Sequence, residues 1–358
     1  MMINKDLIQA EALKHILPHN RCGVDMCMGT GKTRLALKTI KAKNYTKILI
    51  VIPRKSVMDS WIKELKNYPE LATKISFSTY RSFEKQEITY DFLVLDEFHS
   101  LTAKHVDFLK RFKGDILGLS GTPPDNEYDI KYTLMQLYCP IVYTYQVDQA
   151  TSSILNDYEI RVHLLPLNDV KNLVKKGRNK TWVSSEYEDY KYLTNKVTSS
   201  VGKKKNYYAI LRMTAMKSYP SKELLARKIL NAANNKCLLF ANTQKQADKL
   251  CQHSYHSKNP DSKENLELFS DGRIQKMSAV EQLSEGVTIP NLAELIIMHA
   301  YGNNKKSAQK IGRALRLSKE KTATVHILCF KNTVDEEWCK KALANFDKNK
   351  IKTINYGF

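Results

Sequence analysis

Short, uninterrupted apolar runs alternate with segments of helical periodicity along most of the chain. Such runs suit parallel strands that are buried on both faces, whereas amphipathic helices need longer stretches with one apolar side. We predict strands at residues 22–26, 47–52, 74–77, 92–95, 116–119, 159–165, 236–240, 274–278, 295–298 and 324–329. We predict helices at residues 6–18, 34–43, 56–67, 104–111, 307–315 and 335–346. The alternation predicts an α/β protein with open parallel sheets and a site along one sheet edge.

The alternating pattern weakens between Pro140 and Asp157, which we interpret as a linker. A chain of 358 residues is long enough for two domains, each with its own core. We therefore predict two tandem α/β domains, at residues 1–150 and 151–358. The second domain contains a long polar stretch, at about residues 168–230, which we predict to be a basic helical insert.

A glycine-rich segment, Gly29-Thr30-Gly31-Lys32-Thr33, separates the first predicted strand from the helix at residues 34–43. That setting is typical of a phosphate-binding loop. The two glycines allow a tight turn whose N–H groups face phosphate oxygens. Lys32 would then reach the β- and γ-phosphates, and Thr33 would bind Mg²⁺. The strict motif has glycine where this chain has Met26, so the interpretation needs support from the rest of the chain.

Two carboxylates, Asp96 and Glu97, directly follow the predicted strand at residues 92–95. Asp96 can hold Mg²⁺ through water, and Glu97 can orient and deprotonate a water that attacks the γ-phosphate. The alternative is an acidic loop with no chemical role. The phosphate loop upstream favours the interpretation as an ATP and Mg²⁺ site.

The charge of the chain indicates a polyanionic partner. The formal net charge is +20, which favours nucleic acid. The most basic stretch, residues 171–222, carries Lys203, Lys204 and Lys205 with interleaved Trp and Tyr residues, which suit phosphates and stacked bases. The alternative is a solvated insert whose rings pack inward. The scattered cysteines, and the lack of a membrane-length apolar run or a signal-peptide pattern, lead us to expect a soluble cytoplasmic protein.

Together the motifs resemble those of superfamily 2 helicases and translocases of the DExH type. The segments that match motifs Q, I, Ia, Ib, II, III, IV, V and VI are, in that order, Gln9, Gly29–Thr33, Ile52–Arg54, Thr79–Arg81, Asp96–His99, Ser120–Pro123, Leu238–Thr243, Ser284–Pro290 and Gln309–Arg316. The resemblance implies two RecA-like lobes that couple the hydrolysis of ATP, with Mg²⁺, to work on nucleic acid.

The resemblance also implies roles for single residues. Gln9 would read adenine, and Gly286 would contact the nucleotide. Gln309, Arg313 and Arg316 share one face of a predicted helix, so they would meet the nucleotide of the first lobe and stabilise charge on the γ-phosphoryl group. The expected nucleic-acid contacts, besides the three insert lysines, are Arg54, Tyr80, Arg81 and Thr243.

Motifs II and III look less like those of DEAD-box RNA helicases than like those of Snf2-type and restriction-type DNA motors. The run from Ser284 to Arg316 most resembles the UvsW-type recombination helicases of phages. This finer resemblance implies a monomeric motor that unwinds or branch-migrates duplex or branched DNA in recombination, replication or repair. Two alternatives stay open: an RNA helicase, and an ATP-gated module that binds nucleic acid without unwinding it.

Overall fold

The computed structural model describes residues 5–27, 29–146, 149, 157–176, 181–280, 289–299, 322–344 and 346–357. These residues form two compact units, which we call lobe 1 (residues 5–149) and lobe 2 (residues 157–357). Each lobe contains its own parallel sheet, and the two sheets share no strand. The prediction of two tandem parallel α/β lobes is confirmed. The domain limits at residues 150 and 151 stay a prediction.

The sheet of lobe 1 has the strand order β3-β2-β4-β5-β1-β6, and all of its pairs are parallel. Its central strands are continuous apolar runs because helices cover both faces; every residue of β2 and β4 is buried. The strands are β1 Arg21–Met26, β2 Ile48–Ile52, β3 Ile75–Thr79, β4 Phe92–Asp96, β5 Asp115–Ser120 and β6 Ile141–Tyr145.

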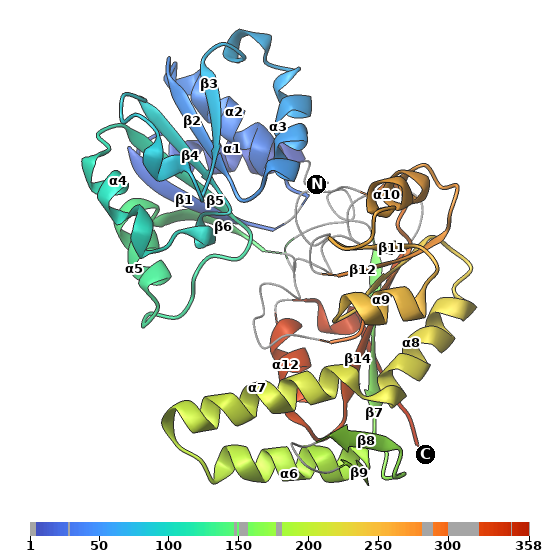
Figure 1. Cartoon of the computed structure of the whole chain (residues 1–358). Helices are drawn as coiled ribbons and strands as arrows, with labels where there is room; N and C mark the ends of the chain where they lie inside the picture. Colours follow the sequence, from blue (N-terminus) through green and yellow to red (C-terminus); the bar gives the residue numbers. More distant parts are fainter. Residues whose placement is uncertain are drawn as a thin grey trace. The chain divides into compact units, whose positions relative to one another are not determined.

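Helices lie on the two faces of this sheet (Figure 1). The helices are α1 Lys5–Ile16, α2 Lys32–Lys43, α3 Met58–Leu65, α4 Val106–Arg111 and α5 Ile130–Tyr138. On one face α2 packs against both α1 and α3. On the other, Phe108 and Leu134 of α4 and α5 join a core with Val51 and Leu95 from the sheet. The carboxyl ends of the parallel strands are thus left at one sheet edge, between these helical layers.

The sheet of lobe 2 has the order β11-β12-β10-β13-β14-β7-β15, again with parallel pairs. Its strands are β7 Tyr158–Leu165, β10 Cys237–Phe240, β11 Ser254–Tyr255, β12 Lys276–Ala279, β13 Glu294–Ile297, β14 Ala323–Phe330 and β15 Ile351–Asn355. Its helices outside the predicted insert are α9 Gln244–Leu250, α10 Ser262–Ser270 and α12 Val334–Ala342. The core that joins Leu239, Leu328 and Phe330 of the sheet to Ala247 of α9 and Leu225 of α8 (Pro220–Ala232) buries one face.

The predicted insert at residues 168–230 is not helical throughout. Its described part begins with an antiparallel hairpin, β8 Leu173–Lys176 and β9 Thr181–Ser184. Two helices follow and pack on each other, α6 Glu186–Thr198 and α7 Gly202–Ser218. The last helix of the range, α8, belongs to the core of lobe 2. The name "insert" is kept below for residues 173–218 only.

The interpretation of residues 140–157 as a linker is wrong at its start. Ile141–Tyr145 forms β6, which pairs with β1 at the edge of the lobe 1 sheet. Helix α5 is a second element that was not predicted from the sequence. Among the residues that the structure describes, no helix is both long enough and apolar enough to cross a membrane.

Candidate nucleotide site in lobe 1

The glycine-rich segment connects the end of β1 at Met26 to the start of α2 at Lys32, as predicted. Gly29 and Gly31 have φ angles of 86° and 84°, in the left-handed region that side chains disfavour. A Cβ atom at Gly31 would also lie 2.3 Å from Nε2 of Gln9, so a side chain there would displace the Gln9 amide. The two glycines therefore set the path of a loop that leads directly into a helix amino terminus.

Gln9 belongs to this loop although it is distant in sequence. Its side chain is buried, and its Nε2 donates a hydrogen bond of 2.9 Å to the carbonyl oxygen of Thr30. The Thr30 hydroxyl in turn donates to the carbonyl of Cys27 at 2.8 Å. The Oε1 atom of Gln9 is buried and accepts no hydrogen bond from the described residues. A buried acceptor of this kind suits a ligand that brings an N–H group, such as the amino group of adenine.

The side chain of Lys32 contacts the end of β1 and lies close to Gly121 of motif III. Its Nζ donates a hydrogen bond of 2.9 Å to the carbonyl oxygen of Met26. Gly121 of motif III lies against the same two groups, because a Cβ atom there would be 2.8 Å from the Met26 oxygen and 3.2 Å from the Lys32 Nζ. The segment after β5 is thus packed on the phosphate loop, and the absence of a side chain at Gly121 makes that contact possible.

Asp96 is the last residue of β4, and its carboxylate is held from a neighbouring helix. The indole Nε1 of Trp61 in α3 donates a hydrogen bond of 2.9 Å to Asp96 Oδ2. The hydroxyl of Tyr80 donates a second bond of 2.9 Å, to the carbonyl oxygen of Asp96. The next residue, Glu97, has φ = 54°, which is uncommon for a residue other than glycine. Such a backbone persists only where its surroundings fix it, and it is frequent at active sites.

Glu97, His99 and Ser120 form a small polar cluster that links motifs II and III. The Nδ1 atom of His99 lies 3.4 Å from Glu97 Oε2 and 3.1 Å from the Ser120 hydroxyl. The Ser120 hydroxyl donates to Glu97 Oε2 at 3.4 Å and accepts the N–H of Thr122 at 3.1 Å. Glu97 and His99 keep 21% and 20% of their side-chain surface exposed, so water can reach the cluster.

These groups meet because their strands are neighbours. Strands β4, β5 and β1 are adjacent and parallel, so Asp96, Ser120 and Met26 end at the same edge of the sheet. A lysine ammonium, two carboxylates and a loop with left-handed glycines are the donor set that a nucleoside triphosphate with Mg²⁺ requires. Of the predicted ATP-site residues, Gln9, Gly29–Thr33, Asp96 and Glu97 lie in this one region of lobe 1.

Tyr80 does not suit its predicted role. Only 7% of the residue is exposed, its ring packs edge-on against Phe83, and its hydroxyl is bonded to the backbone of motif II. Burial also raises the pKa of the phenol well above its usual range. The prediction that its side chain contacts nucleic acid is therefore corrected. Its neighbour Arg81, and Arg54 after β2, are exposed and stay predicted contacts.

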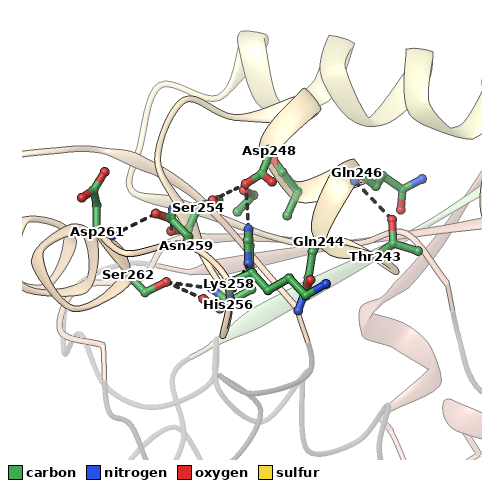
Figure 2. A network of polar contacts seen from close by, with 12 residues as sticks. Thr243, Gln244, Gln246, Asp248, Ser254, His256, Lys258, Asn259, Asp261 and Ser262 are labelled. Atoms are coloured by element: carbon green, nitrogen blue, oxygen red, sulfur yellow. Dashed lines mark hydrogen bonds and ion pairs between the residues drawn. The ribbon is translucent and has the colours of Figure 1, made fainter.

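Thr243 is exposed, and its hydroxyl caps α9 by accepting the N–H of Gln246 at 3.2 Å. Figure 2 shows the polar network beside it. Asp248 Oδ1 accepts the hydroxyl of Ser254 at 2.6 Å and pairs with His256 Nε2 at 2.7 Å, and these two bonds lower the pKa of the Asp248 carboxyl. The Nδ1 atom of His256 accepts the N–H of Lys258, so the network orders the loop that follows β11.

Of the remaining predicted site residues, some are exposed on lobe 2 and others lie outside the described part of the chain. Lys203, Lys204 and Lys205 are exposed near the start of α7. Gly286, Gln309, Arg313 and Arg316 lie outside the described residues, as does the predicted helix at 307–315. Trp61 was not predicted to belong to the site, because its contact with Asp96 joins residues that lie 35 positions apart in the chain.

Comparisons with known proteins agree with this geometry. Residues 3–87 match the family described as type III restriction enzyme, res subunit, and residues 221–318 match the helicase conserved C-terminal domain. The DNA 3'-5' translocase XPB2 of Sulfurisphaera tokodaii is 25% identical, over 91% of this chain and 82% of that protein.

Two solved structures share the fold of the whole chain. The ATP-dependent type ISP restriction-modification enzyme LlaBIII bound to DNA has a TM-score of 0.62 at 15% identity, over 100% of this chain and 31% of that one. S. cerevisiae Dbp5 bound to RNA and ADP BeF3 has a TM-score of 0.59 at 13% identity, over 97% of this chain and 89% of that one. The predicted RecA-like character of the two lobes is thereby confirmed as a fold.

Proposed function

We propose that this chain is a superfamily 2 motor that uses ATP to translocate on DNA; the two family matches and the similarity to a DNA translocase support this proposal. The observation that carries the proposal is the meeting of the phosphate loop, the Asp96–Glu97 pair and the Ser120–Gly121 turn at one edge of the lobe 1 sheet. The loop would bind the phosphates, and the Asp96–Glu97 pair would supply a metal ligand and a base for the transfer of a phosphoryl group to water. The Ser120–Gly121 turn contacts both the loop and Glu97.

Roles follow from the positions of the side chains. Lys32 would exchange its bond to the Met26 carbonyl for bonds to the β- and γ-phosphates, and Thr33 and Asp96 would hold Mg²⁺. Glu97 orients the attacking water and takes its proton, while His99 and Ser120 fix the orientation of its carboxylate. Gln9 offers its buried Oε1 to the adenine amino group. When Mg²⁺ is bound, its charge neutralises the charge that develops on the phosphates.

The second half of the catalytic set comes from lobe 2 in this proposal. Gln309, Arg313 and Arg316 would stabilise negative charge on the γ-phosphoryl group, and Gly286 would lie at the nucleotide. Arginines supplied in this manner raise hydrolysis rates by about 10³–10⁵-fold in related phosphoryl-transfer enzymes. The requirement for both lobes is what would make hydrolysis depend on their closure.

DNA is the favoured polymer, for two reasons. The curated relative that covers most of the chain is named as a DNA translocase, and one structure with the same fold is bound to DNA. Dbp5, with a TM-score only slightly lower, is bound to RNA, so the fold does not discriminate between the polymers. We propose duplex or branched DNA as the substrate, with unwinding or branch migration as the outcome, and an RNA helicase as the second candidate.

The proposed contacts to the polymer are exposed polar, basic and aromatic side chains. Arg54 and Arg81 follow the ends of β2 and β3, and Thr243 follows β10. In the insert, Lys203–Lys205 are joined by rings with exposed surface, Trp182 at 45%, Tyr192 at 58% and Tyr207 at 57%. Cations that neutralise phosphates and exposed rings that stack on bases are a combination found in proteins that bind nucleic acid with little sequence preference.

The test is the ATPase rate of the full chain with single-stranded, duplex, forked and four-way DNA, compared with RNA at equal nucleotide concentration. Lys32→Ala serves as the inactive control. We expect stimulation by duplex or branched DNA and strand displacement on the fork. Stimulation by RNA far above that by any DNA would replace the DNA motor with the RNA helicase, and the absence of hydrolysis with every polymer would reject the motor.

A further inference from the structure

Asp96 is held at two different atoms by two residues from segments far apart in the sequence. Trp61 of α3 donates to its carboxylate, and Tyr80, just after β3, donates to its backbone carbonyl, both at 2.9 Å. Both donors are buried, with 1% and 7% of their surface exposed. A buried indole N–H or phenol needs an acceptor. Here the acceptor is in both cases the residue proposed to hold the metal ion.

Each of these donors is connected to an exposed arginine that we propose binds the polymer. Arg81 directly follows Tyr80 in the chain. Arg54 precedes a single 3₁₀ turn, Lys55–Val57, which continues into α3 and Trp61. Residues 54–61 and 80–81 therefore each contain an exposed arginine and a buried side chain that donates a hydrogen bond to Asp96 of motif II.

We propose that Trp61 and Tyr80 are positioning residues that transmit the binding of nucleic acid at Arg54 and Arg81 to the orientation of Asp96. This inference rests on the proposed ATPase function and explains how a polymer would stimulate it. Trp61 fixes the carboxylate that faces the metal, and Tyr80 fixes the peptide that leads into the left-handed Glu97.

The packing around the two donors is suited to transmitting a displacement. Trp61 packs edge-on against Phe77 of β3, with ring centroids 6.4 Å apart. The Tyr80 carbonyl accepts a hydrogen bond of 2.8 Å from His105 Nε2, and its ring lies against both Phe83 and His105. Close-packed interiors have low compressibility, so a shift of α3 or of the 79–81 turn moves the attached atom of Asp96. Without such a shift, the two bonds hold Asp96 in its polymer-free orientation.

The first experiment compares three variants of the full chain. Trp61→Phe and Tyr80→Phe each remove one donor to Asp96 and keep an aromatic ring. Tyr45→Phe is the matched control, because its hydroxyl donates to Asp115 in the same lobe, away from motif II. We expect both test variants to lower DNA stimulation of the ATPase about tenfold, the factor that corresponds to about 1.4 kcal/mol. The affinity for DNA should stay within about twofold of wild type, so the loss appears in the DNA-stimulated kcat and not in the binding of the polymer.

The second experiment does not depend on turnover. With Trp182 and Trp338 replaced by Phe, the emission of the chain comes from Trp61 alone. We expect DNA to change this emission when Mg²⁺ and a non-hydrolysable ATP analogue are present, and Asp96→Asn to abolish the change. A melting temperature recorded for every variant separates loss of coupling from loss of folding.

The outcomes are distinguishable. If wild type is stimulated by no polymer, the proposed function fails and the inference falls with it. If DNA stimulates the ATPase of both variants as strongly as that of wild type, and DNA does not change the Trp61 emission, the coupling role is refuted. The proposed ATPase motor is not affected by that result. Equal losses in the Tyr45→Phe control would also refute the coupling role, because they would show a general effect of removing a side-chain hydrogen-bond donor from lobe 1.

Discussion

One methyl group added at Gly121 tests the central packing of the nucleotide site. A Cβ atom at this position would lie 2.8 Å from the carbonyl oxygen of Met26 and 3.2 Å from the Lys32 Nζ. The first contact is with backbone at the end of β1, which cannot turn away. The φ angle of Gly121 is not positive, so Gly121→Ala introduces no backbone strain and acts through steric overlap alone.

The size of the effect can be bounded. Extra methylene groups forced into well-packed sites cost about 1–3 kcal/mol. The structure offers two ways to relieve the overlap: the Ser120–Thr122 turn moves away from the loop, or the loop moves with Lys32. Either movement separates groups that must act together on one phosphate. We therefore expect kcat to fall about 10–100-fold, with a smaller rise in the KM for ATP.

The assay is steady-state ATP hydrolysis with saturating duplex DNA, together with the affinity of a fluorescent ATP analogue. Gly357→Ala is the matched control, since nothing lies within 4 Å of the Cβ position there. A Gly121→Ala protein with wild-type kcat and wild-type nucleotide affinity would show that motif III does not pack on the phosphate loop in the working enzyme, and the reasoning about the site would be wrong.

Three further predictions concern the acid of motif II and the core of lobe 2. Glu97→Gln should bind ATP normally and hydrolyse it about 10²–10⁴-fold more slowly, measured by single-turnover hydrolysis beside equilibrium binding; normal turnover would remove Glu97 as the base. Asp335→Asn should destabilise lobe 2 by about 3–5 kcal/mol, because it leaves the fully buried Lys222 ammonium without a counter-charge; the measurement is denaturant unfolding followed by the fluorescence of Trp338 in a chain whose Trp61 and Trp182 are replaced by Phe. A loss below about 1 kcal/mol would contradict this, and Lys340→Met, at an exposed ion pair, is the control. Burial lowers the pKa of His163 and His326 to about 4, so the unfolded chain binds more protons between about pH 6.5 and 4, and lobe 2 should lose stability as the pH falls through that window; replacing both residues with Gln should flatten this dependence in melting curves.

The elements that the sequence predicted well are those buried on both faces. Strands β2 and β4 are continuous apolar runs because helices cover both sides, so their composition alone reveals them. Strands β6 and β15 lie at sheet edges, and most of their residues are partly or fully exposed. Their sequences, Ile-Val-Tyr-Thr-Tyr and Ile-Lys-Thr-Ile-Asn, mix polar and apolar residues, and only their pairing identifies them as strands.

The candidate site divides in a similar way. The phosphate loop and the Asp96–Glu97 pair are local patterns, so spacing along the chain was enough to predict them. The contact of Trp61 with Asp96 depends on how α3 packs beside β4, which no local pattern contains. Tyr80 shows the opposite error, because a motif gives the position of a residue in the chain but not the direction of its side chain.

A lysine, a carboxylate and a histidine occur together in each lobe, and their exposure separates chemistry from structure. In lobe 2, Lys222 and Asp335 have no exposed side-chain surface, and His299 lies 2.9 Å from Asp335 Oδ1. The neighbouring charges outweigh the effect of burial and lower the pKa of Asp335 to about 2, while burial lowers that of His299.

That cluster is sealed from solvent: the Asp335 carboxylate also accepts the N–H of Phe330 at 2.9 Å, so it joins α8, α12 and β14. In lobe 1, Glu97 and His99 each keep about a fifth of their side-chain surface exposed, and the Lys32 side chain is bonded to the backbone carbonyl of Met26. Groups that solvent reaches are open to a substrate, whereas groups sealed from solvent join elements of the fold. This difference in exposure favours the sheet edge of lobe 1 as the candidate site and a stabilising role for the polar core of lobe 2.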